Sequence, residues 1–568
     1  MIKFCGRVCC LSPINSCSSS KVVASPPMEK MLLKTLQAIF LFSLLYFAIP
    51  SFSYPLSTRG RWIIDEETGQ RVKLSCVNWA SHLEPMIAEG LDKQPLSKIV
   101  AQIVQNKFNC VRLTWPTFMF TREIFGSRTV TYSFDSLDLN EAKAGFAKNN
   151  PALLNMTVIQ VYDAVVDELG AQGVMVLLDN HVSQPKWCCN NDDGNGFFGD
   201  THFNPDEWVK GLVTVATHFK HKKQVVSIST RNEPHGAREN ENDWLKYIGI
   251  GARMIHRANP HVLVPVSGIK YSRDFSFLKE KPFLSNNLDN KLVYEAHWYK
   301  FSEEHSDIWD VQPLNRVCAE SSLYMMDHSA FLTDGDNPVP LFLGEFGLNQ
   351  QDLTDSERRY MSCIKAFIAE RDFDWGLWAL QGGYYLREGK TGTEETFGVL
   401  NGNWDQLRNP KFIESLHFLQ GKIQDPFSNQ STSYVMYHPL SGNPVHVNGK
   451  NELYVTNSSV WSRWSHDGNG TPIRLMDSAQ CLKVVGDGLE PILSTDCSTQ
   501  QSAWSEVSHS KLQLAAKDVN GDLLCLDKKS PDSSQILTTK CICIEDDDSS
   551  CLDDPQSQWF KLIRTNIK

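Results

Sequence analysis

Eight short runs of apolar and β-branched residues alternate with helix-length segments between residues 70 and 385 of this 568-residue chain. Most runs are apolar throughout, as is typical of strands that are buried on both faces. Helix-length segments such as Leu153–Gly170 and Thr354–Ala369 separate them. The runs are Val72–Trp79, Phe108–Trp115, Val174–Asn180, Val225–Thr230, Val262–Ser267, Leu292–His297, Leu341–Glu345 and Trp375–Leu380.

This alternation predicts the α/β class and, within it, a (β/α)8 TIM barrel, whose functional site lies at the C-terminal ends of the strands. A doubly wound open sheet is the alternative architecture. It is disfavoured because no glycine-rich phosphate loop follows the first run.

Two glutamates stand at the ends of two of these runs. Glu233 follows the fourth run in the segment Asn232-Glu233-Pro234, and Glu345 closes the seventh. Two carboxyl groups that face one cavity are what glycosidic bond cleavage requires, one as acid and one as nucleophile or base. The alternative interpretation is that each is a strand-end carboxylate paired with a nearby arginine.

Other polar and aromatic residues stand at the same ends of the predicted strands. Each alone has a structural explanation, such as a histidine at the edge of the core or a tryptophan that packs within the barrel. Together they predict a substrate-binding site around the two glutamates. These residues are Arg112, His181, Asn232, His297, Tyr299 and Trp378.

The composition sets limits on the kind of protein. The length indicates two globular domains, and 41% hydrophobic with 21% charged residues is typical of folded protein. The net charge is −11, and the longest basic run is 220–223. This balance argues against nucleic acid as a partner, because such binding depends on neutralising phosphates.

The N-terminus is typical of a secretory signal. From Met28, two lysines precede an apolar stretch over 38–49 and then Pro50. At about twelve residues the stretch is short for a membrane span of about twenty, although an uncleaved anchor is an alternative. Twelve cysteines follow Tyr54, and sequons lie at Asn155, Asn429, Asn457 and Asn469. We therefore expect secretion, to an extracellular or cell-wall location, with residues 1–53 as leader and signal peptide.

Beyond Gly421 the sequence becomes richer in Ser, Thr, Asn and Asp, and helical periodicity ends. Two units repeat there with the same cysteine spacing, Cys481 to Cys497 and Cys525 to Cys541, and a cysteine-free copy spans 434–464. Three units of about forty residues predict an all-β trefoil with a loop disulfide in each of the later two repeats. We place the barrel domain at 54–425 and the trefoil at 426–568. Cys543 and Cys551 bracket an acidic insertion and are candidates for a further disulfide.

The loop 186–198 follows the third run and contains two adjacent cysteines. Because adjacent cysteines rarely bond each other without strain, at least one of Cys188 and Cys189 is expected to bridge elsewhere. The loop is predicted to be either a cleft wall, with Trp187, Phe197 and Phe198 as stacking platforms, or a disulfide-pinned surface loop. Zinc binding by the cysteines and calcium binding by the acidic residues are weaker alternatives.

On these motifs, residues 60–420 resemble glycoside hydrolase family 5, the cellulase-type barrel enzymes of clan A. The eight recurring active-site residues of the family are matched in order by the two glutamates and the six residues named with them. The resemblance implies a retaining double displacement in which Glu345 is the nucleophile and Glu233 the acid and then the base. Arg112 is expected to keep Glu345 ionised. The charge of Glu345 and a hydrogen bond from His297 are expected to favour a protonated Glu233.

The resemblance assigns supporting roles as well. Tyr299 is expected to hydrogen-bond Glu345, and Asn232 to hold the sugar 2-hydroxyl. Trp378 is expected to form a floor for the apolar face of the −1 sugar.

Residues 426–568 resemble a ricin B-type lectin domain, and the pairing of the two modules is similar to that of a plant subgroup. The third repeat has Asp527 after its first cysteine, but the second has Lys483 in the matching place. Both repeats lack the aromatic residue before the second cysteine. Strong galactose binding is therefore not expected. The alternatives are weak glycan binding, a trefoil with a structural role, and one that binds a different ligand.

The sequence thus predicts a secreted retaining β-glycosidase, monomeric and with no cofactor or metal. Its expected substrate is a β-linked polysaccharide of glucan or mannan type, or a glycoside derived from one. One alternative is a lectin-like carbohydrate-binding protein with a vestigial barrel, which the presence of both glutamates disfavours. Another is a transglycosylase that uses the same site with a sugar as acceptor.

Overall fold

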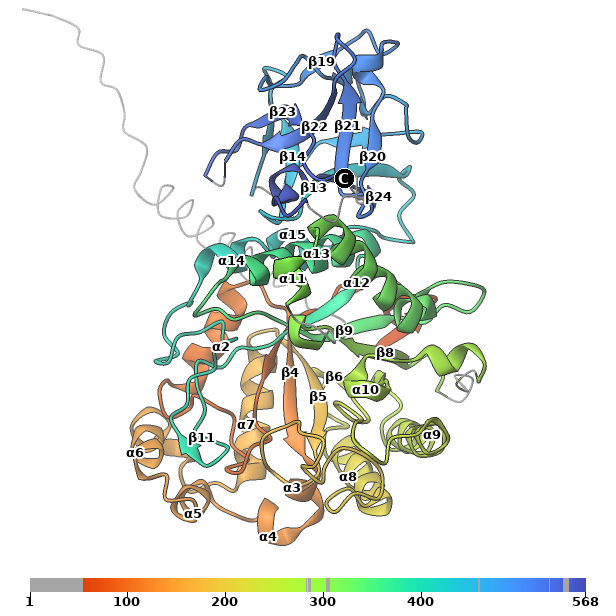
Figure 1. Ribbon diagram of the computed structural model, residues 1–568. Helices are drawn as coiled ribbons and strands as arrows, with labels where there is room; N and C mark the ends of the chain where they lie inside the picture. Colours follow the sequence, from red (N-terminus) through yellow and green to blue (C-terminus); the bar gives the residue numbers. More distant parts are fainter. Residues whose placement is uncertain are drawn as a thin grey trace, which may run out of the picture. The chain divides into compact units, whose positions relative to one another are not determined.

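In a computed structural model of the chain, eight parallel strands pair in the order β6-β5-β4-β3-β10-β9-β8-β7 (Figure 1). A bridge between Ser227 and Leu263 joins β6 to β7, so the sheet closes into a barrel. Each of the eight predicted runs overlaps one of these strands, and the predicted (β/α)8 barrel is confirmed. The strands are β3 (Ser75–Trp79), β4 (Cys110–Pro116), β5 (Met175–Val182), β6 (Val225–Ile228), β7 (Val264–Ser267), β8 (Leu292–His297), β9 (Leu341–Phe346) and β10 (Asp374–Leu377).

The structure describes residues 55–567 apart from 282, 284–287, 303–306, 458–459, 531 and 545–550. The predicted leader and signal peptide lie outside these residues, as do their cysteines, most of the acidic insertion and part of the sequon at Asn457.

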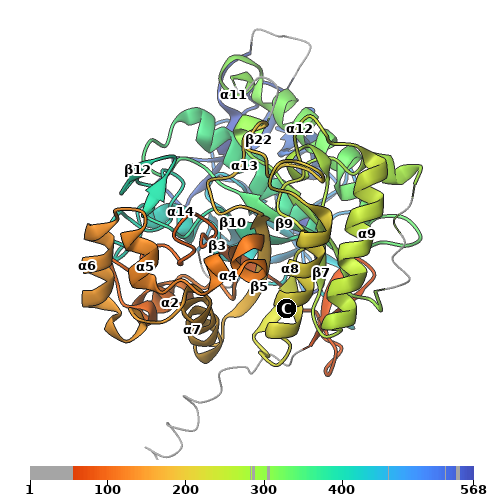
Figure 2. The ribbon, with the colours of Figure 1, turned by 90° about the horizontal axis from the view of Figure 1, so that it is seen from below.

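Helices surround the strands of the barrel (Figure 2). Both helix-length segments named above overlap a helix, α7 and α13 respectively. In the described part of the chain, no helix is both long enough and apolar enough to cross a membrane. The helices of this region are α2 (Leu96–Gln105), α3 (Thr117–Thr121), α4 (Glu123–Gly126), α5 (Val130–Asp135), α6 (Asn140–Asn149), α7 (Val158–Ala171), α8 (Pro205–His218), α9 (Glu241–Ala258), α10 (Ile269–Ser272), α11 (Ile308–Val311), α12 (Leu314–His328), α13 (Asp355–Arg371), α14 (Pro410–Glu414) and α15 (His417–Gln420).

The interior of the barrel is apolar at the N-terminal ends of its strands. A hairpin of β1 (Leu56–Arg59) and β2 (Trp62–Asp65) contributes Leu56 and Ile63 to this apolar layer. Every second residue of a strand faces the interior, so the next inward positions form a second layer. That second layer is polar, and it is where the functional site begins. The strand residues of the apolar layer are Cys76, Cys110, Met175, Leu177, Val226, Val293 and Phe342, with Leu263 at the entry to β7.

The C-terminal region is a strand-rich domain. Strand β13 pairs with β14, β16 and β24, and β20 to β23 form a separate four-stranded sheet. The trefoil interpretation and the boundary at 425/426 stay predictions. The strands are β13 (Ser433–His438), β14 (Asn443–Val447), β15 (Leu453–Val455), β16 (Arg463–Ser465), β17 (Arg474–Leu475), β18 (Cys481–Lys483), β19 (Ile492–Ser494), β20 (Ser505–Val507), β21 (Gln513–Lys517), β22 (Leu523–Lys528), β23 (Ile536–Lys540) and β24 (Lys561–Thr565).

A buried asparagine of α12 joins this domain to the barrel region. The Asn315 side chain donates to Gln513 Oε1 and to the carbonyl of Cys543, both at 2.8 Å. It accepts from Trp559 Nε1 at 3.0 Å and from Ser510 Oγ at 2.7 Å. All four hydrogen bonds of the amide are thus made to C-terminal residues, and all described residues belong to one compact unit.

All twelve cysteines after Tyr54 are paired. The two predicted repeat disulfides, Cys481–Cys497 and Cys525–Cys541, are confirmed, as is the candidate Cys543–Cys551. Cys76–Cys110 and Cys318–Cys363 are two further bridges. The expectation that Cys188 or Cys189 bridges elsewhere is wrong, because these two residues are bonded to each other.

Candidate active site

A cavity of about 560 Å³ opens at the C-terminal ends of the barrel strands. Six of the eight predicted site residues line it: His181, Asn232, Glu233, Tyr299, Glu345 and Trp378. The other two, Arg112 and His297, are each 1% exposed and hydrogen-bond residues that line the cavity. The structure therefore brings all eight predicted residues together. A larger hollow of about 830 Å³ between the 89–93 and 383–404 segments contains none of them.

The two glutamates lie side by side in this cavity. A carboxyl oxygen of Glu233, one of Glu345 and a ring nitrogen of His297 all lie within 4.8 Å of one another. Glu345 accepts hydrogen bonds from Arg112 Nη1 at 2.7 Å and from the Tyr299 hydroxyl at 2.9 Å. His297 Nδ1 lies 2.7 Å from Glu233 Oε1 and 3.7 Å from Glu345 Oε2. The histidine thus bridges the two carboxyl groups.

Beneath the glutamates, the guanidinium of Arg112 is surrounded by acceptors from several strands. Its Nε lies 2.7 Å from Glu295 Oε1, and its Nη2 lies 3.0 Å from Asp179 Oδ1. It also donates to Asn78 Oδ1 at 3.0 Å and to Asn232 Oδ1 at 2.8 Å. Both Nη atoms donate to acceptors and Nε lies beside the Glu295 carboxylate, so the position of this buried cation and that of Glu345 are closely defined.

Asp179 and Glu295 are two residues of the site that were not predicted from the sequence. Each stands two residues before a predicted site histidine, in Asp179-x-His181 and Glu295-x-His297. Residues two apart on a strand share a face, so these spacings are a signal for carboxylate–histidine pairs. His181 Nδ1 lies 2.6 Å from Asp179 Oδ2, and His297 Nε2 lies 3.4 Å from Glu295 Oε1.

A glycine of β9 makes room for this charged layer. A Cβ atom on Gly344 would stand 2.1 Å from Glu295 Oε1. Any side chain at this position would therefore displace the carboxylate that binds both Arg112 and His297.

An aromatic stack forms one wall of the cavity. The ring of Trp378 lies parallel to that of His181, with centroids 5.6 Å apart, and is 8% exposed. His181 Nε2 lies 3.4 Å from Asn232 Nδ2. The contacts of His181 with Asp179 and Asn232 therefore fix the position of the ring against which Trp378 packs.

The pKa values of the two glutamates shift in directions opposite to those expected from the sequence. Burial raises the pKa of Glu233, but the hydrogen bond and charge of His297 outweigh it and hold this pKa below its ordinary value. Burial raises the pKa of Glu345 above its ordinary value, although His297 and Arg112 oppose the rise. Both directions are opposite to the expected ones: the charge of His297 lowers the pKa of Glu233, and burial raises the pKa of Glu345.

His297 accounts for the lowered pKa of Glu233. Burial alone would lower its pKa, but the charge of Glu345 and hydrogen bonds with Glu233 and Glu295 raise the pKa of His297 to about 10. The imidazole is therefore a cation at neutral pH.

The loop 186–198 only partly follows its prediction. Trp187 lines the cavity, as expected of a cleft wall. Phe197 and Phe198 are 0% and 5% exposed and pack in the core near Trp208, so the prediction that they are stacking platforms is wrong. Asp193 accepts hydrogen bonds from the backbone of Asn190 and Asn195, which engages its carboxylate within the loop.

Two groups of potential metal ligands occur among the described residues. One is Cys188, Cys189 and Glu233, and the other is Glu233, His297 and Glu345. In the first group the sulfurs are bonded to each other, so neither is a thiolate. In the second group the raised pKa of His297 favours its cationic form, and this imidazole hydrogen-bonds Glu233 and lies 3.7 Å from Glu345. Because a metal ligand must be deprotonated, the cysteines and the histidine are not available as ligands in this state.

The side chain of Asp527, which the sequence predicts to contact sugar in the third C-terminal repeat, makes hydrogen bonds within its own domain. Asp527 Oδ2 accepts from Thr539 Oγ1 at 2.7 Å and lies 3.4 Å from Gln558 Nε2. In the second repeat, Lys483 lies 3.3 Å from Asp496. Both side chains are thus paired within their own domain.

Comparisons with known proteins agree with the geometry. A family profile described as "Cellulase (glycosyl hydrolase family 5)" matches residues 67–383. A "Glycosyl hydrolase 5 family protein" of Chamaecyparis obtusa is 44% identical over 537 residues, which cover 92% of this chain and 95% of that protein. An endoglucanase of Paenibacillus polymyxa is 22% identical over 372 residues, which cover 62% of this chain and 84% of that protein. A solved complex of a variant endocellulase from Pyrococcus horikoshii with cellotetraose has a TM-score of 0.52 at 19% identity, covering 66% of this chain and all of that one.

His297→Gln should change how stability depends on pH. A pKa raised from 6.5 to about 10 gives stabilisation that is complete below pH 6.5 and is lost as the pH rises through about 10. Each unit of elevation is worth about 1.4 kcal/mol at most. We expect the free energy of unfolding of the unaltered protein to fall more steeply between pH 6.5 and 10 than that of the variant, in denaturant titrations. His221→Gln, at an exposed histidine, is the control, and parallel curves for the unaltered protein and His297→Gln would contradict the assignment.

Proposed function

The chain belongs to glycosyl hydrolase family 5 and is a glycoside hydrolase, and we propose that it is a secreted enzyme that cleaves a cellulose-type β-glucan by a retaining double displacement. The proposal assigns Glu345 as nucleophile and Glu233 as acid and base. One observation carries it: the paired carboxyl groups at the end of the barrel.

The spacing of these carboxyl groups supports retention rather than inversion. Retaining enzymes hold them about 5–5.5 Å apart, whereas inverting enzymes need about 6.5–9.5 Å to admit a water molecule. In this site an oxygen of Glu233 lies within 4.8 Å of one of Glu345. Such a distance favours direct attack on the anomeric carbon by one of the two carboxylates.

The contacts of Glu345 support its role as nucleophile. Arg112 and Tyr299 each bind a different oxygen of this carboxylate, which orients it and stabilises its charge. In the first step Glu345 attacks the anomeric carbon while Glu233 donates its proton to the leaving oxygen. In the second step Glu233 takes a proton from water, and that water displaces Glu345 from the sugar.

Asn232 and Trp378 are assigned to the sugar in the −1 position. The Asn232 carbonyl oxygen is bound by Arg112, so its amide nitrogen is the group that can reach a hydroxyl. The exposed face of Trp378 offers an apolar surface for the sugar ring.

The proton of the glutamate pair is central to this cycle. Two carboxyl groups so close titrate as a unit, and the form competent for the first step carries its single proton on Glu233. The lowered pKa of Glu233 favours the opposite arrangement in the free protein. It is well suited to the second step, in which Glu233 must be ionised to activate water.

The cleft and the similar proteins support a β-glucan as substrate. Aromatic side chains line the cavity, and such faces bind the apolar sides of glucose rings. The Paenibacillus protein is an endoglucanase, and the Pyrococcus enzyme was solved with cellotetraose. We therefore propose internal cleavage of β-1,4-linked glucan, with mannan as the substrate to be tested against it. The aromatic residues of the cavity are Trp187, Tyr271, Tyr299, Phe301, Trp378 and Phe397.

We also propose that the C-terminal domain is a ricin B-type trefoil and that the chain belongs to a plant subgroup of the family. The similarity to the Chamaecyparis protein covers 92% of this chain and so includes C-terminal residues. The hydrogen bonds that Asp527 makes within its own domain leave its carboxylate less available to a sugar, which supports weak rather than strong glycan binding. Secretion is supported by the disulfides and by the exposure of all four sequon asparagines.

Release of reducing sugar tests the proposed function. The unaltered protein should release reducing ends from β-1,4-glucan faster than from β-1,3-glucan, mannan or xylan. Glu233→Gln should lower that rate by at least about a hundredfold, because proton transfer contributes about 10²–10⁴-fold. Glu241→Gln, on the outer helix α9, is the matched control. Preference for mannan would overturn the substrate proposal, and equal rates in all three proteins would overturn the site.

Rescue by azide separates the roles of the two glutamates. With an aryl β-glycoside that needs no acid, Glu345→Ala should be inactive until azide attacks in place of the missing nucleophile, and it should yield the α-azide. Glu233→Ala should form the glycosyl-enzyme and yield the β-azide. Product NMR distinguishes the two. The reverse pattern of anomers would exchange the assigned roles.

A further inference from the structure

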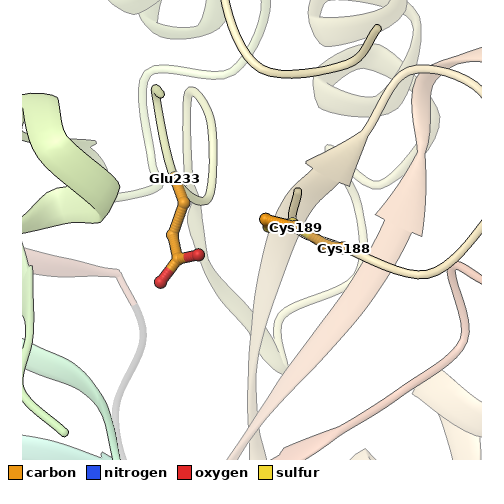
Figure 3. Close-up of side chains that lie close together, drawn as sticks. All are labelled: Cys188, Cys189 and Glu233. Carbon is orange, nitrogen blue, oxygen red and sulfur yellow. A yellow bond between two sulfur atoms is a disulfide. The ribbon is translucent and has the colours of Figure 1, made fainter. Parts of the chain in front are cut away.

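The disulfide between two adjacent cysteines lies in the substrate cavity beside Glu233. Cys188 and Cys189 both line the cavity, and their sulfurs and a Glu233 oxygen lie within 4.8 Å of one another (Figure 3). The retaining mechanism described above gives no role to these sulfurs.

The loop that carries the disulfide is fixed to the segment that carries Glu233. Arg231 donates to the carbonyl of Asn195 and, at 3.2 Å, to Ser183 Oγ. His235 Nε2 lies 3.2 Å from the carbonyl of Asn190. These contacts lie on both sides of Glu233 in the sequence, so the distance from the disulfide to the carboxyl group is held by the fold.

The disulfide lies on a definite side of the reaction centre. Glu233 lies close to two sets of side chains. Among the described residues, one set is Cys188 and Cys189, the other is His297 and Glu345, and only Glu233 belongs to both. Glu345 acts on the anomeric carbon of the −1 sugar, and Glu233 acts on the oxygen that joins this sugar to the leaving group. The sulfurs are grouped with Glu233 but not with Glu345, which favours a position on the side of the leaving group.

The sulfurs add to the apolar surface that Trp187 contributes there. The guanidinium of Arg387 lies 3.6 Å from the centroid of the Trp187 ring, and the Tyr384 ring meets it in an edge-to-face arrangement. At least one face of Trp187 is therefore covered. A disulfide offers polarizable atoms without a strong donor, which suits contact with the C–H groups of a sugar.

We infer that the Cys188–Cys189 disulfide is a specificity-determining wall of the cleft, against which the leaving-group sugar packs while Glu233 protonates the glycosidic oxygen. The ligand is a β-linked hexopyranose unit on the leaving-group side. This inference rests on the proposed function.

The disulfide also touches the residue assigned to the −1 sugar. Asn232 Nδ2 lies 3.7 Å from Cys188 Sγ and 3.9 Å from Cys189 Sγ. A purely positioning role through Asn232 would affect every substrate equally. A wall for the leaving group would affect only substrates whose leaving group is a sugar, and this difference provides the test.

The test compares two substrates with the double variant Cys188→Ser/Cys189→Ser. Cellopentaose has a sugar as leaving group, whereas β-cellobiosyl fluoride has one too small to reach the disulfide. We expect kcat/KM to fall about tenfold or more for cellopentaose, mainly through KM, and to stay within about twofold for the fluoride. The matched control, Cys543→Ser/Cys551→Ser, removes a disulfide of the C-terminal domain and should change neither value.

Thermal unfolding shows whether the double variant folds. If it does not, the unaltered protein is reduced with a phosphine under native conditions, the opened pair is identified by alkylation and mass spectrometry, and the same two substrates are compared. An equal loss on both substrates, or no loss on either, overturns the inference while the proposed function stands. Failure of the unaltered protein to hydrolyse either substrate contradicts the proposed function, and the inference falls with it.

Discussion

The buried guanidinium of Arg112 is the interaction on which the site depends. It lies inside the barrel with side-chain exposure of 1%, and it binds carboxylates from three other strands through Asp179, Glu295 and Glu345. These carboxylates outweigh the effect of burial and raise the pKa of Arg112 above its ordinary value. Removing one partner of such a buried pair typically costs about 3–5 kcal/mol, because the remaining charge is left without compensation. The same contacts that hold the strands in register therefore aim Glu345 at the cavity.

The barrel builds this site in layers. Apolar residues and the Cys76–Cys110 disulfide fill the N-terminal end, and the Arg112 layer rests on them. His181 and His297 form the next inward positions, two residues after Asp179 and Glu295. Each histidine is held from below by a carboxylate and in turn contacts a residue of the cavity. Because His297 also bears a charge, its position above Glu295 and beside the two glutamates influences which glutamate holds the proton of the pair.

Much of this arrangement could be predicted from the sequence. The apolar runs predicted the barrel, because few folds accommodate strands that are buried on both faces and alternate with helices. The eight site residues were found because most of them lie at or just beyond the C-terminal ends of the strands, where the barrel brings side chains together. Asp179 and Glu295 were missed because their runs were treated as uniformly apolar, although the spacing of two before a histidine was visible. The place of Phe197 and Phe198 in the core, the Cys188–Cys189 bond and the contacts of Asn315 depend on tertiary packing, which no local pattern encodes.

The proposed roles of Glu233 and Glu345 require that the anomeric configuration is retained, and the configuration of the first product tests this directly. Proton NMR of cellopentaose hydrolysis, recorded before the released sugar equilibrates in water, distinguishes the two anomers. The account predicts that the β-anomer appears first and the α-anomer follows only by mutarotation. An α-anomer formed first would show a single displacement by water, and the short distance between the two carboxyl groups would then need another explanation.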